Sequence, residues 1–493
     1  MLVAEVPDLL PALPEIFLAL AAMALLMVGV FQSQGSVALA VNSHRQVTRL
    51  GLAALIVTLL LVVFNSDDAS QLTFGEMFIV DGFSDFFKVL ILFSSGIGLV
   101  MAREYLELYR IARFEYPVLI LFATLGMLMM VSANDFMSLY LGLELQSLSL
   151  YVIASFHRDD VRSNEAGLKY FVLGALASGL LLYGASMIYG FSGTTNFSAL
   201  ATVFEHLGEE GAPIGVIVGL VFVLAGLAFK VSAVPFHMWT PDVYEGAPTP
   251  VTAFFSVAPK LAAIALLMRV MIEPFGELFV EWQQIIIFVS IASMLLGAFA
   301  ALGQSNIKRL MAYSSIGHVG YALIGLAVGN EDGLSSVLVY MGIYIVMNIG
   351  VFTCILCMRR REQMMVNISD LSGVSKTSPM MALALAIFLF SMAGIPPLAG
   401  FFGKLYIFLS AVEAGLYALA IIGVLSSVVS AYYYLRIVKI MYFDEAGEGF
   451  DREFGSELRF IMVCAAAFIL LFFLVPSPLL SSAAHAAAAL FGA

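Results

Sequence analysis

Charged residues are scarce in this chain. Asp, Glu, Lys and Arg together make up 12% of its 493 residues, and hydrophobic residues make up 61%. A soluble globular domain carries about 25% charged residues, so the composition excludes that class. It indicates instead a protein that crosses a membrane many times.

Cysteine is also scarce, with three residues in the whole chain. Cys354 and Cys357 form a CxxC pair at the end of an apolar run, with no second pair and no nearby His. We interpret them as packing residues. Neither an iron–sulfur ligand set nor a nucleotide-binding glycine loop can be assembled from the sequence. We therefore expect no cofactor and no metal in this chain, and any electron chemistry to occur in another one.

Long apolar runs are abundant, and about fourteen of them reach the roughly 20 residues that a bilayer-spanning helix needs. They begin near Leu10, Thr48, Gly82, Tyr116, Phe136, Ala166, Pro213, Thr249, Trp282, Lys308, Leu334, Ser378, Glu413 and Leu458. The first run follows Glu5 and Asp8 with no Lys or Arg, unlike a cleaved signal peptide, so we expect it to remain as the first span. The sequence predicts an all-α polytopic membrane protein of about fourteen helices.

Basic residues sort to one side of the membrane when these spans are numbered in order. Of the 23 Lys and Arg residues, all but five fall in connections on the same side. By the positive-inside rule that side is the cytoplasm, which places both termini on the periplasmic side. The five exceptions lie within spans: Lys88, Lys230, Lys260, Arg269 and Lys404.

Two of these five basic residues have simple interpretations. Arg269 lies near the outer end of span eight, where its side chain could reach the lipid headgroups, although a functional role is an equal alternative. Lys88 follows Asp85 by three residues, on the same face of a helix, and we expect a local ion pair between them.

The other three lysines and one acid are harder to explain by local effects. Lys230 and Lys404 are preceded by 19 and 27 residues without charge, and Lys260 and Glu144 lie near the middle of their spans. A charge inside a membrane is costly and is a functional hypothesis by default. Burial also disfavours the ammonium form of lysine, so a buried lysine is suited to load and release a proton.

Proline breaks accompany two of these lysines. Pro235 follows Lys230 by five residues in span seven, and Pro396 and Pro397 precede Lys404 in span twelve. Proline frees backbone carbonyls, which are tolerated at membrane depth only against protein or a hydrated cavity. The two spans are five apart, and an odd shift reverses their direction, as two inverted five-helix repeats would require. Bending of the helices for packing is the alternative.

The same shift of five spans pairs Glu144 in span five with His318 in span ten. His318 is a candidate proton relay, or alternatively a neutral core histidine bonded to a carbonyl. The expected organisation is three N-terminal helices in residues 1–115 and a first five-helix repeat in residues 116–271. A second, inverted repeat is expected in residues 282–442, followed by a cytoplasmic loop and a last helix in residues 443–493.

Three sequence motifs resemble the antiporter-like subunits of respiratory complex I, the proton-translocating NADH-quinone oxidoreductase. They are Gly142-Leu-Glu144-Leu, the stretch from Phe229-Lys230 to Trp239, and Ala393-Gly-Ile-Pro-Pro-Leu-Ala-Gly-Phe-Phe-Gly-Lys404. The resemblance covers nearly the whole chain. It implies that the proton-carrying residues of that family fall here on Glu144, Lys230, Lys260 and Lys404.

The resemblance also implies the partners and the setting. Quinone reduction elsewhere in the complex would drive proton pumping, with FMN, iron–sulfur clusters and quinone held by partner subunits. The expected neighbours are the antiporter-like subunit M, the small subunit K and the lipid bilayer, with no nucleic acid. The expected location is the bacterial inner membrane. A subunit of a multisubunit cation/proton antiporter and a purely structural membrane spacer are the alternatives.

The mechanism that we expect begins with an ion pair between Glu144 and Lys230, which would hold the lysine protonated. When a neighbouring subunit draws Glu144 away, the proton would pass from Lys230 to Lys260. It would then move through water and His318 to Lys404 and outward.

Overall fold

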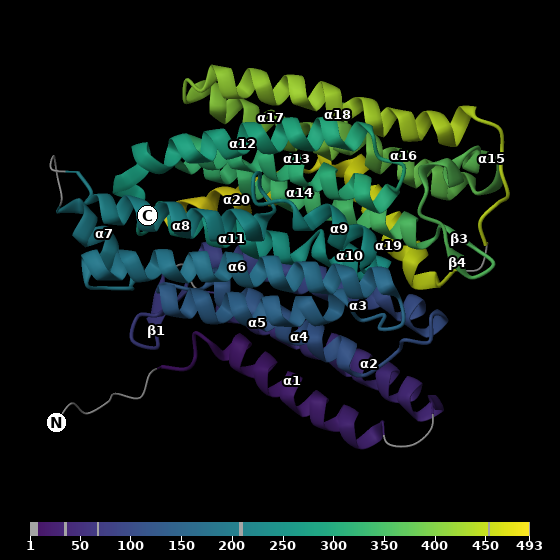
Figure 1. Ribbon diagram of the computed structural model, residues 1–493, viewed down its shortest axis with the longest axis horizontal. Helices are drawn as coiled ribbons and strands as arrows, with labels where there is room; N and C mark the ends of the chain where they lie inside the picture. The colour runs from purple at the N-terminus through teal and green to yellow at the C-terminus, as the bar shows by residue number, and fades with distance from the viewer. Residues whose placement is uncertain (1–7, 34–36, 67–68, 207–210, 452–453, 493) are drawn as a thin grey trace.

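The computed structural model describes residues 8–33, 37–66, 69–206, 211–451 and 454–492. Glu5, which we used to characterise the first span, lies outside these residues, as do the two chain ends. The helices run side by side along the long axis of the molecule (Figure 1). The N-terminal helices lie at one edge of this bundle in the view, and α17 and α18 lie at the opposite edge.

Most of the described chain is helical. The helices are α1 (Leu13–Gln32), α2 (Val37–Asn65), α3 (Gly82–Leu108), α4 (Glu115–Val131), α5 (Phe136–Ala154), α6 (Val161–Ser192), α7 (Phe197–Glu205), α8 (Ile214–Val231), α9 (Trp239–Gly246), α10 (Thr249–Phe255), α11 (Ala258–Ile272), α12 (Phe279–Leu302), α13 (Ile307–Val328), α14 (Glu331–Leu356), α15 (Val374–Thr377), α16 (Pro379–Ala393), α17 (Ala399–Glu413), α18 (Tyr417–Phe443), α19 (Ser456–Leu471) and α20 (Ser477–Leu490). Two short hairpins pair β1 (Gln71–Thr73) with β2 (Phe78–Val80) and β3 (Arg359–Arg360) with β4 (Gln363–Met364).

The predicted spans correspond to these helices. Within the described residues, twelve helical segments are long and apolar enough to cross a membrane, and two shorter apolar helices, Glu115–Val131 and Pro379–Ala393, occupy the other two predicted spans. The all-α membrane fold is confirmed. The sequence analysis did not predict the connecting helix α7, the two hairpins or the last helix α20, which packs between α3 and α14.

Local sequence sets the ends of many helices. Asp81, Asp135 and Asn306 each accept hydrogen bonds from backbone amides in the first turn of α3, α5 and α13, because those amides have no partner within the helix. Gly193 and Gly329 adopt a left-handed conformation directly after α6 and α13. Glycine takes up this conformation without the steric cost of a side chain.

Both predicted helix breaks are present. Helix α8 ends at Val231 before Pro235, and α16 ends at Ala393 before the prolines at 396 and 397. A third break, which we did not predict, separates α10 from α11 just ahead of Pro259 and so lies next to Lys260. Proline at the first turn of a helix needs no amide partner, so Pro259 was the available signal.

The two halves repeat the same contacts. Gly126 of α4 faces the backbone of Gly142 on α5, and Gly297 of α12 faces the backbone of Gly317 on α13, so closely that an added Cβ would meet backbone atoms within 2.6 Å in both places. Single β-bridges also match: Asp135, the cap of α5, pairs with Asn196, and Asn306, the cap of α13, pairs with Asn367. The agreement at corresponding positions fits two repeats related by a shift of five spans.

Arg269 does not reach the headgroups, and that interpretation is wrong. Its side chain is 0% exposed, and its guanidinium donates to both carboxylate oxygens of Asp81 at 2.9 Å. It also pairs with Glu273 and donates to the carbonyl of Val131. Two acids and a carbonyl therefore satisfy the arginine inside the protein, and the contact fixes α11 against the start of α3.

Lys88 forms a different ion pair from the one we expected. Its ammonium lies 2.9 Å from Glu15 on α1, and the two side chains are 1% and 6% exposed. The hydrophobic packing of α1 against α2 and α4 brings Glu15 to Lys88, a contact between distant segments that local spacing could not show. This buried pair links α1 to α3.

Removal of one partner of this pair should destabilise the protein strongly. Lys88→Met leaves Glu15 buried without its partner, which typically costs about 3–5 kcal/mol. Adding Glu15→Gln should restore much of the lost stability, because no buried charge then remains at that contact. Thermal denaturation of the solubilised complex measures the effect, and the control is Lys439→Met, which breaks the exposed pair with Asp444. Equal stability of Lys88→Met and the control would contradict this account.

Candidate functional site

Lys230 lies in the last turn of α8 and is buried. Its ammonium donates to the Ser147 hydroxyl at 2.7 Å and lies 6.0 Å from the centre of the Tyr151 ring. Ser147 is on α5, three residues after Glu144. The structure therefore brings Lys230 to α5, the helix that carries Glu144. Its partner there is the Ser147 hydroxyl and not the Glu144 carboxylate.

The expected ion pair between Glu144 and Lys230 is not formed. Among the described residues, Glu144 has no ion-pair partner, and its buried Oε1 atom has no hydrogen bond. Ser147, three residues after Glu144 on α5, occupies the position next to the ammonium instead. Glu144 is half-buried on the surface of α5. This position leaves it accessible to a group outside the chain.

Lys260 and Lys404 both bind carbonyl groups at helix ends. Lys260 lies 3.5 Å from the carbonyl oxygen of Val231, the last residue of α8. Lys404 donates to the carbonyls of Met392 and Ala393, at the end of α16, at 2.9 and 3.2 Å. The C-terminal end of a helix carries partial negative charge and unpaired carbonyls, so it attracts a cation.

The two broken helices use their lysines differently. Lys230 belongs to the segment before its break, whereas Lys404 belongs to α17, after its break, and reaches back to α16. Lys260, on the neighbouring helix α11, contacts the end of the broken helix in the first half. Lys404 makes the matching contact in the second half. The sequence analysis had paired Lys230 with Lys404 by span number alone.

His318 lies at the centre of a group of tyrosines and serines. Its Nδ1 atom is hydrogen-bonded to the Tyr340 hydroxyl, and its Nε2 atom to the Tyr434 hydroxyl at 3.1 Å. Tyr434 is also hydrogen-bonded to Ser314. His318 therefore has two hydroxyl partners from α14 and α18, and the carbonyl contact that we considered as an alternative is not the one formed.

Further hydroxyl groups extend from this group toward Lys404. Lys404 donates to Ser427 at 2.8 Å and lies 5.0 Å from the centre of the Tyr321 ring. The Tyr321 hydroxyl is bonded to Ser426 at 3.1 Å. On the other side of His318, Ser315 is bonded to Tyr344 at 2.7 Å.

Sequence reasoning missed these hydroxyl groups. Tyr340 and Tyr344 are four residues apart in an apolar span, and Ser426, Ser427 and Ser430 cluster in another. Residues four apart share a helix face, so a polar face within an apolar helix was the available signal. Their meeting with His318, however, depends on the packing of three separate helices.

Buried polar atoms around the first break have no protein partner. Within the described part of the chain these atoms are Gln146 Oε1, Tyr151 Oη, Ser232 Oγ, His237 Nδ1, Thr240 Oγ1 and Tyr244 Oη. All lie on or beside α5, α8 and α9, and Lys260 is 5.8 Å from the centre of the Tyr244 ring. Buried polar groups nearly always have a partner, and ordered water supplies it where protein does not. The His318 group contrasts with these atoms, because its hydroxyls bond to one another.

Lys308 is a further buried lysine that the sequence analysis had assigned to the cytoplasmic connections. It lies at the start of α13 and donates to the carbonyls of Glu245 and Ala247 at 2.9 and 2.6 Å. These carbonyls belong to the end of α9 and the residue after it. Lys308 thus binds a third helix end, in the same manner as Lys260 and Lys404.

A group of charged residues lies beside Lys308. Asp242 accepts hydrogen bonds from Lys169 at 2.7 Å and from Arg309 at 2.8 Å. Partial burial tends to raise the pKa of Asp242, but the bonds from Lys169 and Arg309 outweigh this effect and lower the pKa below its usual value. Asp242 therefore stays ionised and joins α6, α9 and α13.

Residues that could hold a metal ion are not grouped in the described structure, where no cluster of three or more His, Cys, Asp or Glu side chains occurs. Cys354 and Cys357 are free thiols buried in the core. Their positions agree with the packing role that we expected for this pair.

The Tyr434 hydroxyl should matter for proton movement without supporting the fold. Tyr434→Phe keeps the ring but removes the hydroxyl that His318 and Ser314 share, so we expect slower proton translocation with normal assembly. The matched control is Tyr432→Phe, two residues away on the same helix and 63% exposed. Proton uptake by vesicles that contain each variant measures the effect, and equal rates for the two variants would contradict it.

Comparisons with known proteins agree with this geometry. A family model described as NADH:quinone oxidoreductase/Mrp antiporter, TM matches residues 133–430, which include the site residues described above except Tyr434. NADH-quinone oxidoreductase subunit N from Parvibaculum lavamentivorans is 59% identical and covers 99% of each chain. Subunit N 1 from Rhizobium meliloti is 56% identical over 97% of each chain.

Solved structures show the same fold. A chain of respiratory complex I from Thermus thermophilus is 32% identical, with a TM-score of 0.80, and the match covers 96% of this chain and 100% of that one. A chain of the Mrp complex from Dietzia is 24% identical with a TM-score of 0.82, and at that identity the likeness concerns the fold alone.

Two features of the sequence resemble subunit N among the antiporter-like subunits. They are a lysine rather than an acid at position 404 and the stretch Asp370-Leu-Ser-Gly. The full-length relatives agree with that choice. The chain belongs to the subunit N family of NADH-quinone oxidoreductases.

Proposed function

We propose that this chain is a proton-translocating subunit in the membrane arm of NADH-quinone oxidoreductase, driven by quinone reduction elsewhere in the complex. The observation that carries the proposal is the arrangement of Lys230, Lys260 and Lys404. All three are buried in a multi-pass membrane protein, and none has an acid as its direct partner among the described residues. Their hydroxyl and carbonyl partners favour the ammonium less strongly than a carboxylate would, so each lysine is able to exchange its proton.

The proposed path has a hydrated half and a hydroxyl-bonded half. Lys230 passes its proton to Lys260 through water bound to the unpartnered polar atoms near Ser232 and Tyr244. From Lys260 the proton reaches Lys404 through the His318 group, in which each tyrosine or serine hydroxyl accepts one proton and releases another. Glu144 acts from the edge of the chain, where a neighbouring subunit can move its charge toward or away from Lys230. Lys308 and the charged group at Asp242 provide the entrance.

The redox chemistry and its cofactors belong to other subunits in this proposal. FMN, the iron–sulfur clusters and the quinone are held by partner chains, and this chain does not oxidise NADH. Other subunits of the complex are its partners, and subunits M and K are the proposed neighbours. The membrane is the bacterial inner membrane.

A subunit of a cation/proton antiporter is the second candidate function, because the family model and the fold include such proteins. The full-length relatives at more than 50% identity favour the redox-driven complex. Sodium- or potassium-dependent proton exchange without a redox partner would support the antiporter instead. A structural spacer is disfavoured by buried lysines whose contacts recur at three helix ends.

The domain boundaries and the orientation are part of the proposal. Residues 116–271 and 282–442 form the two inverted repeats, which the matching glycine contacts and β-bridges support. The hairpin of β3 and β4 faces the cytoplasm, and both termini face the periplasm. In support, α1 begins and α20 ends at the end of the bundle opposite to that hairpin (Figure 1).

Replacing Lys230 with Ala tests the proton path. We expect the complex to assemble but to pump protons more slowly during quinone-linked NADH oxidation, by at least tenfold if this lysine is obligatory. Lys439→Ala, which removes an exposed lysine on α18, should leave both rates unchanged. Undiminished proton uptake at normal assembly in Lys230→Ala would exclude the proposed role.

Cysteine labelling tests the orientation. In a Cys464→Ser background, which removes the exposed native thiol, Arg361→Cys places a thiol in the turn between β3 and β4, where Arg361 is 86% exposed. A membrane-impermeant maleimide should label it in inverted vesicles only. Gly193→Cys, beyond the other end of α6, should be labelled in right-side-out vesicles only. The reverse pattern would overturn the orientation but not the fold.

A further inference from the structure

Three ionisable side chains meet near the starts of α1 and α3, outside the proposed proton path. The Lys88 ammonium lies 2.9 Å from Glu15 of α1, and Asp85 precedes Lys88 by three residues on α3. Lys88, Glu15 and Asp85 are 1%, 5% and 8% exposed. The charges of Glu15 and Lys88 both act on Asp85, so the three side chains form one group, the Glu15–Asp85–Lys88 cluster.

Hydrogen bonds from the protein do not satisfy this cluster. Both carboxylate oxygens of Glu15 and the Oδ2 atom of Asp85 are buried without a hydrogen-bond partner among the described residues. The Lys88 ammonium also lies 5.3 Å from the centre of the Phe78 ring, which accepts no conventional hydrogen bond. Buried polar atoms nearly always have a partner, so the unpartnered oxygens indicate that the cluster binds a small ligand.

The cluster also lacks positive charge. Two carboxylates accompany one ammonium, and Asp81, whose charge also acts on Asp85, adds none that is positive. Arg269 is already bonded to Asp81 and Glu273. With both of its carboxyl groups ionised, the cluster would carry one uncompensated negative charge, and such a charge is costly in a buried site.

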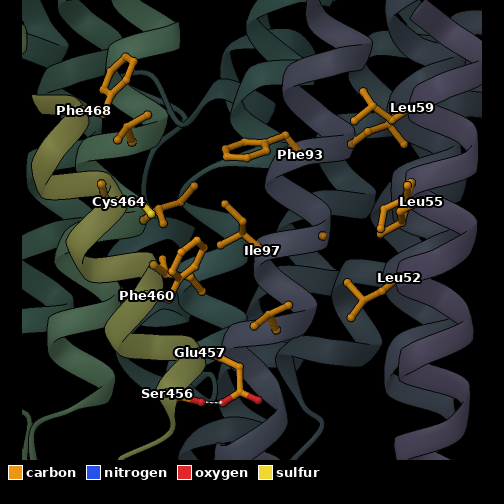
Figure 2. Close-up of a pocket in the computed structure, with 18 residues that line it drawn as sticks. Leu52, Leu55, Leu59, Phe93, Ile97, Ser456, Glu457, Phe460, Cys464 and Phe468 are labelled. Carbon is orange, nitrogen blue, oxygen red and sulfur yellow. Dashed lines mark hydrogen bonds between the residues drawn. The ribbon is translucent and has the colours of Figure 1, made fainter. Parts of the chain in front are cut away.

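The rest of α3 offers no compensating charge nearby. No charged residue separates Lys88 from Arg103 along this helix. In that stretch α3 lines an apolar groove, and Figure 2 shows Phe93 and Ile97 pointing across it toward Cys464 of α19. Apolar surroundings disfavour a net charge, so the cluster is more stable when it is neutral.

A proton fits the cluster better than a metal ion does. The described part of the chain contains no group of three or more His, Cys, Asp or Glu side chains placed to hold a metal. The Lys88 ammonium is already next to Glu15 and would repel a second cation. A proton on one carboxyl group removes the surplus negative charge, and it also gives that group a hydrogen-bond donor.

Asp85 connects the cluster to one end of the bundle. It lies in the first turn of α3, and its carboxylate is hydrogen-bonded to Ser66, an exposed residue directly after α2. The hairpin of β1 and β2, which leads into α3, lies at the end of the bundle opposite to β3 and β4 (Figure 1). A proton can therefore enter or leave the cluster from the aqueous phase on that side.

We propose that Glu15, Asp85 and Lys88 form a proton-binding site that holds one proton and exchanges it with the aqueous phase at the β1–β2 end of the bundle. The bound proton keeps the cluster neutral, which favours the packing of α1 onto the bundle. Loss of the proton leaves a net negative charge between α1 and α3 and weakens this packing. The site is independent of the proton path through Lys230, Lys260 and Lys404.

The proposal fixes how the packing of α1 depends on pH. When α1 detaches, the carboxyl groups enter water, where they are ionised above about pH 4. The packed state then binds one proton more than the detached state, so the packing weakens as the pH rises. The equilibrium constant for packing falls by up to about tenfold per pH unit until the packed state has also lost its proton.

Hydrogen–deuterium exchange of the purified complex measures this dependence. After correction for the chemical exchange rate, protection of the α1 amides should fall at least tenfold between about pH 6 and about pH 9, relative to α18. In Asp85→Asn the Lys88–Glu15 pair is neutral without a bound proton, so α1 should lose this dependence. The matched control is Asp332→Asn, an exposed residue in the first turn of α14, which should behave as the unchanged protein does.

A second acid variant keeps the test decisive if Asp85→Asn fails to assemble. Glu15→Gln leaves Asp85 as the only acid for Lys88 in the cluster, so this variant should also lose the pH dependence. Equal pH dependence of α1 protection in the control and in an assembled acid variant would overturn the proposal.

Two further outcomes would assign the effect to another group. His485 of α20 lies beside Gly82 at the start of α3. His485→Gln should retain the pH dependence of α1, and its loss in this variant would overturn the proposal. Protection restored at about pH 9 by sodium chloride, but not by choline chloride, would also overturn it, because the cluster would then bind a metal ion in place of the proton.

Discussion

Backbone carbonyls left unpaired inside a membrane must find partners, and this requirement organises the centre of the protein. The ends of α8, α9 and α16 each leave backbone carbonyls without a partner in their own helix. Lys260, Lys308 and Lys404 donate to those carbonyls. The same contacts that make the breaks tolerable also retain three lysines in the interior. Structure and proposed function therefore depend on one interaction, between a lysine ammonium and a helix end.

The arrangement also explains why a lysine suits these positions. A carboxylate would repel the partial negative charge at the end of a helix, whereas an ammonium is attracted to it. The attraction between an ammonium and a helix end is weaker than that between two full opposite charges. Lys88–Glu15 and Arg269–Asp81 are buried pairs of the second kind. Those two pairs join helices. The lysines at the breaks have only dipolar partners, which leaves their protons available for transfer.

The two halves of the proposed path differ, although the two proposed repeats share glycine contacts and β-bridges at corresponding positions. Near α8 the polar atoms lack protein partners and are suited to bind water, whereas near α16 the tyrosines and serines bond to His318 and to one another. Protons can move through either kind of chain. The hydroxyl-bonded half is held in place by side chains from α13, α14 and α18, so its geometry depends directly on how those helices pack.

The sequence by itself determined the membrane class, the spans, the two proline breaks and three of the buried lysines, Lys230, Lys260 and Lys404, but not Lys308. Each of these depends on composition or on residues close together in the chain: apolar length, proline beside lysine, and a charge isolated in an apolar run. The correspondence of the two halves, inferred from span number, stays a prediction that the glycine contacts and β-bridges support.

Tertiary structure alone decided which groups meet. Lys88 pairs with Glu15 rather than Asp85, Arg269 is buried rather than at the headgroups, and Lys230 contacts Ser147 rather than Glu144. Each contact joins helices far apart in sequence, and the packing of whole helix faces, not local spacing, sets which side chains face each other. The sequence could therefore name the lysines, but only the packed helices could show that two of them bind the ends of the broken helices.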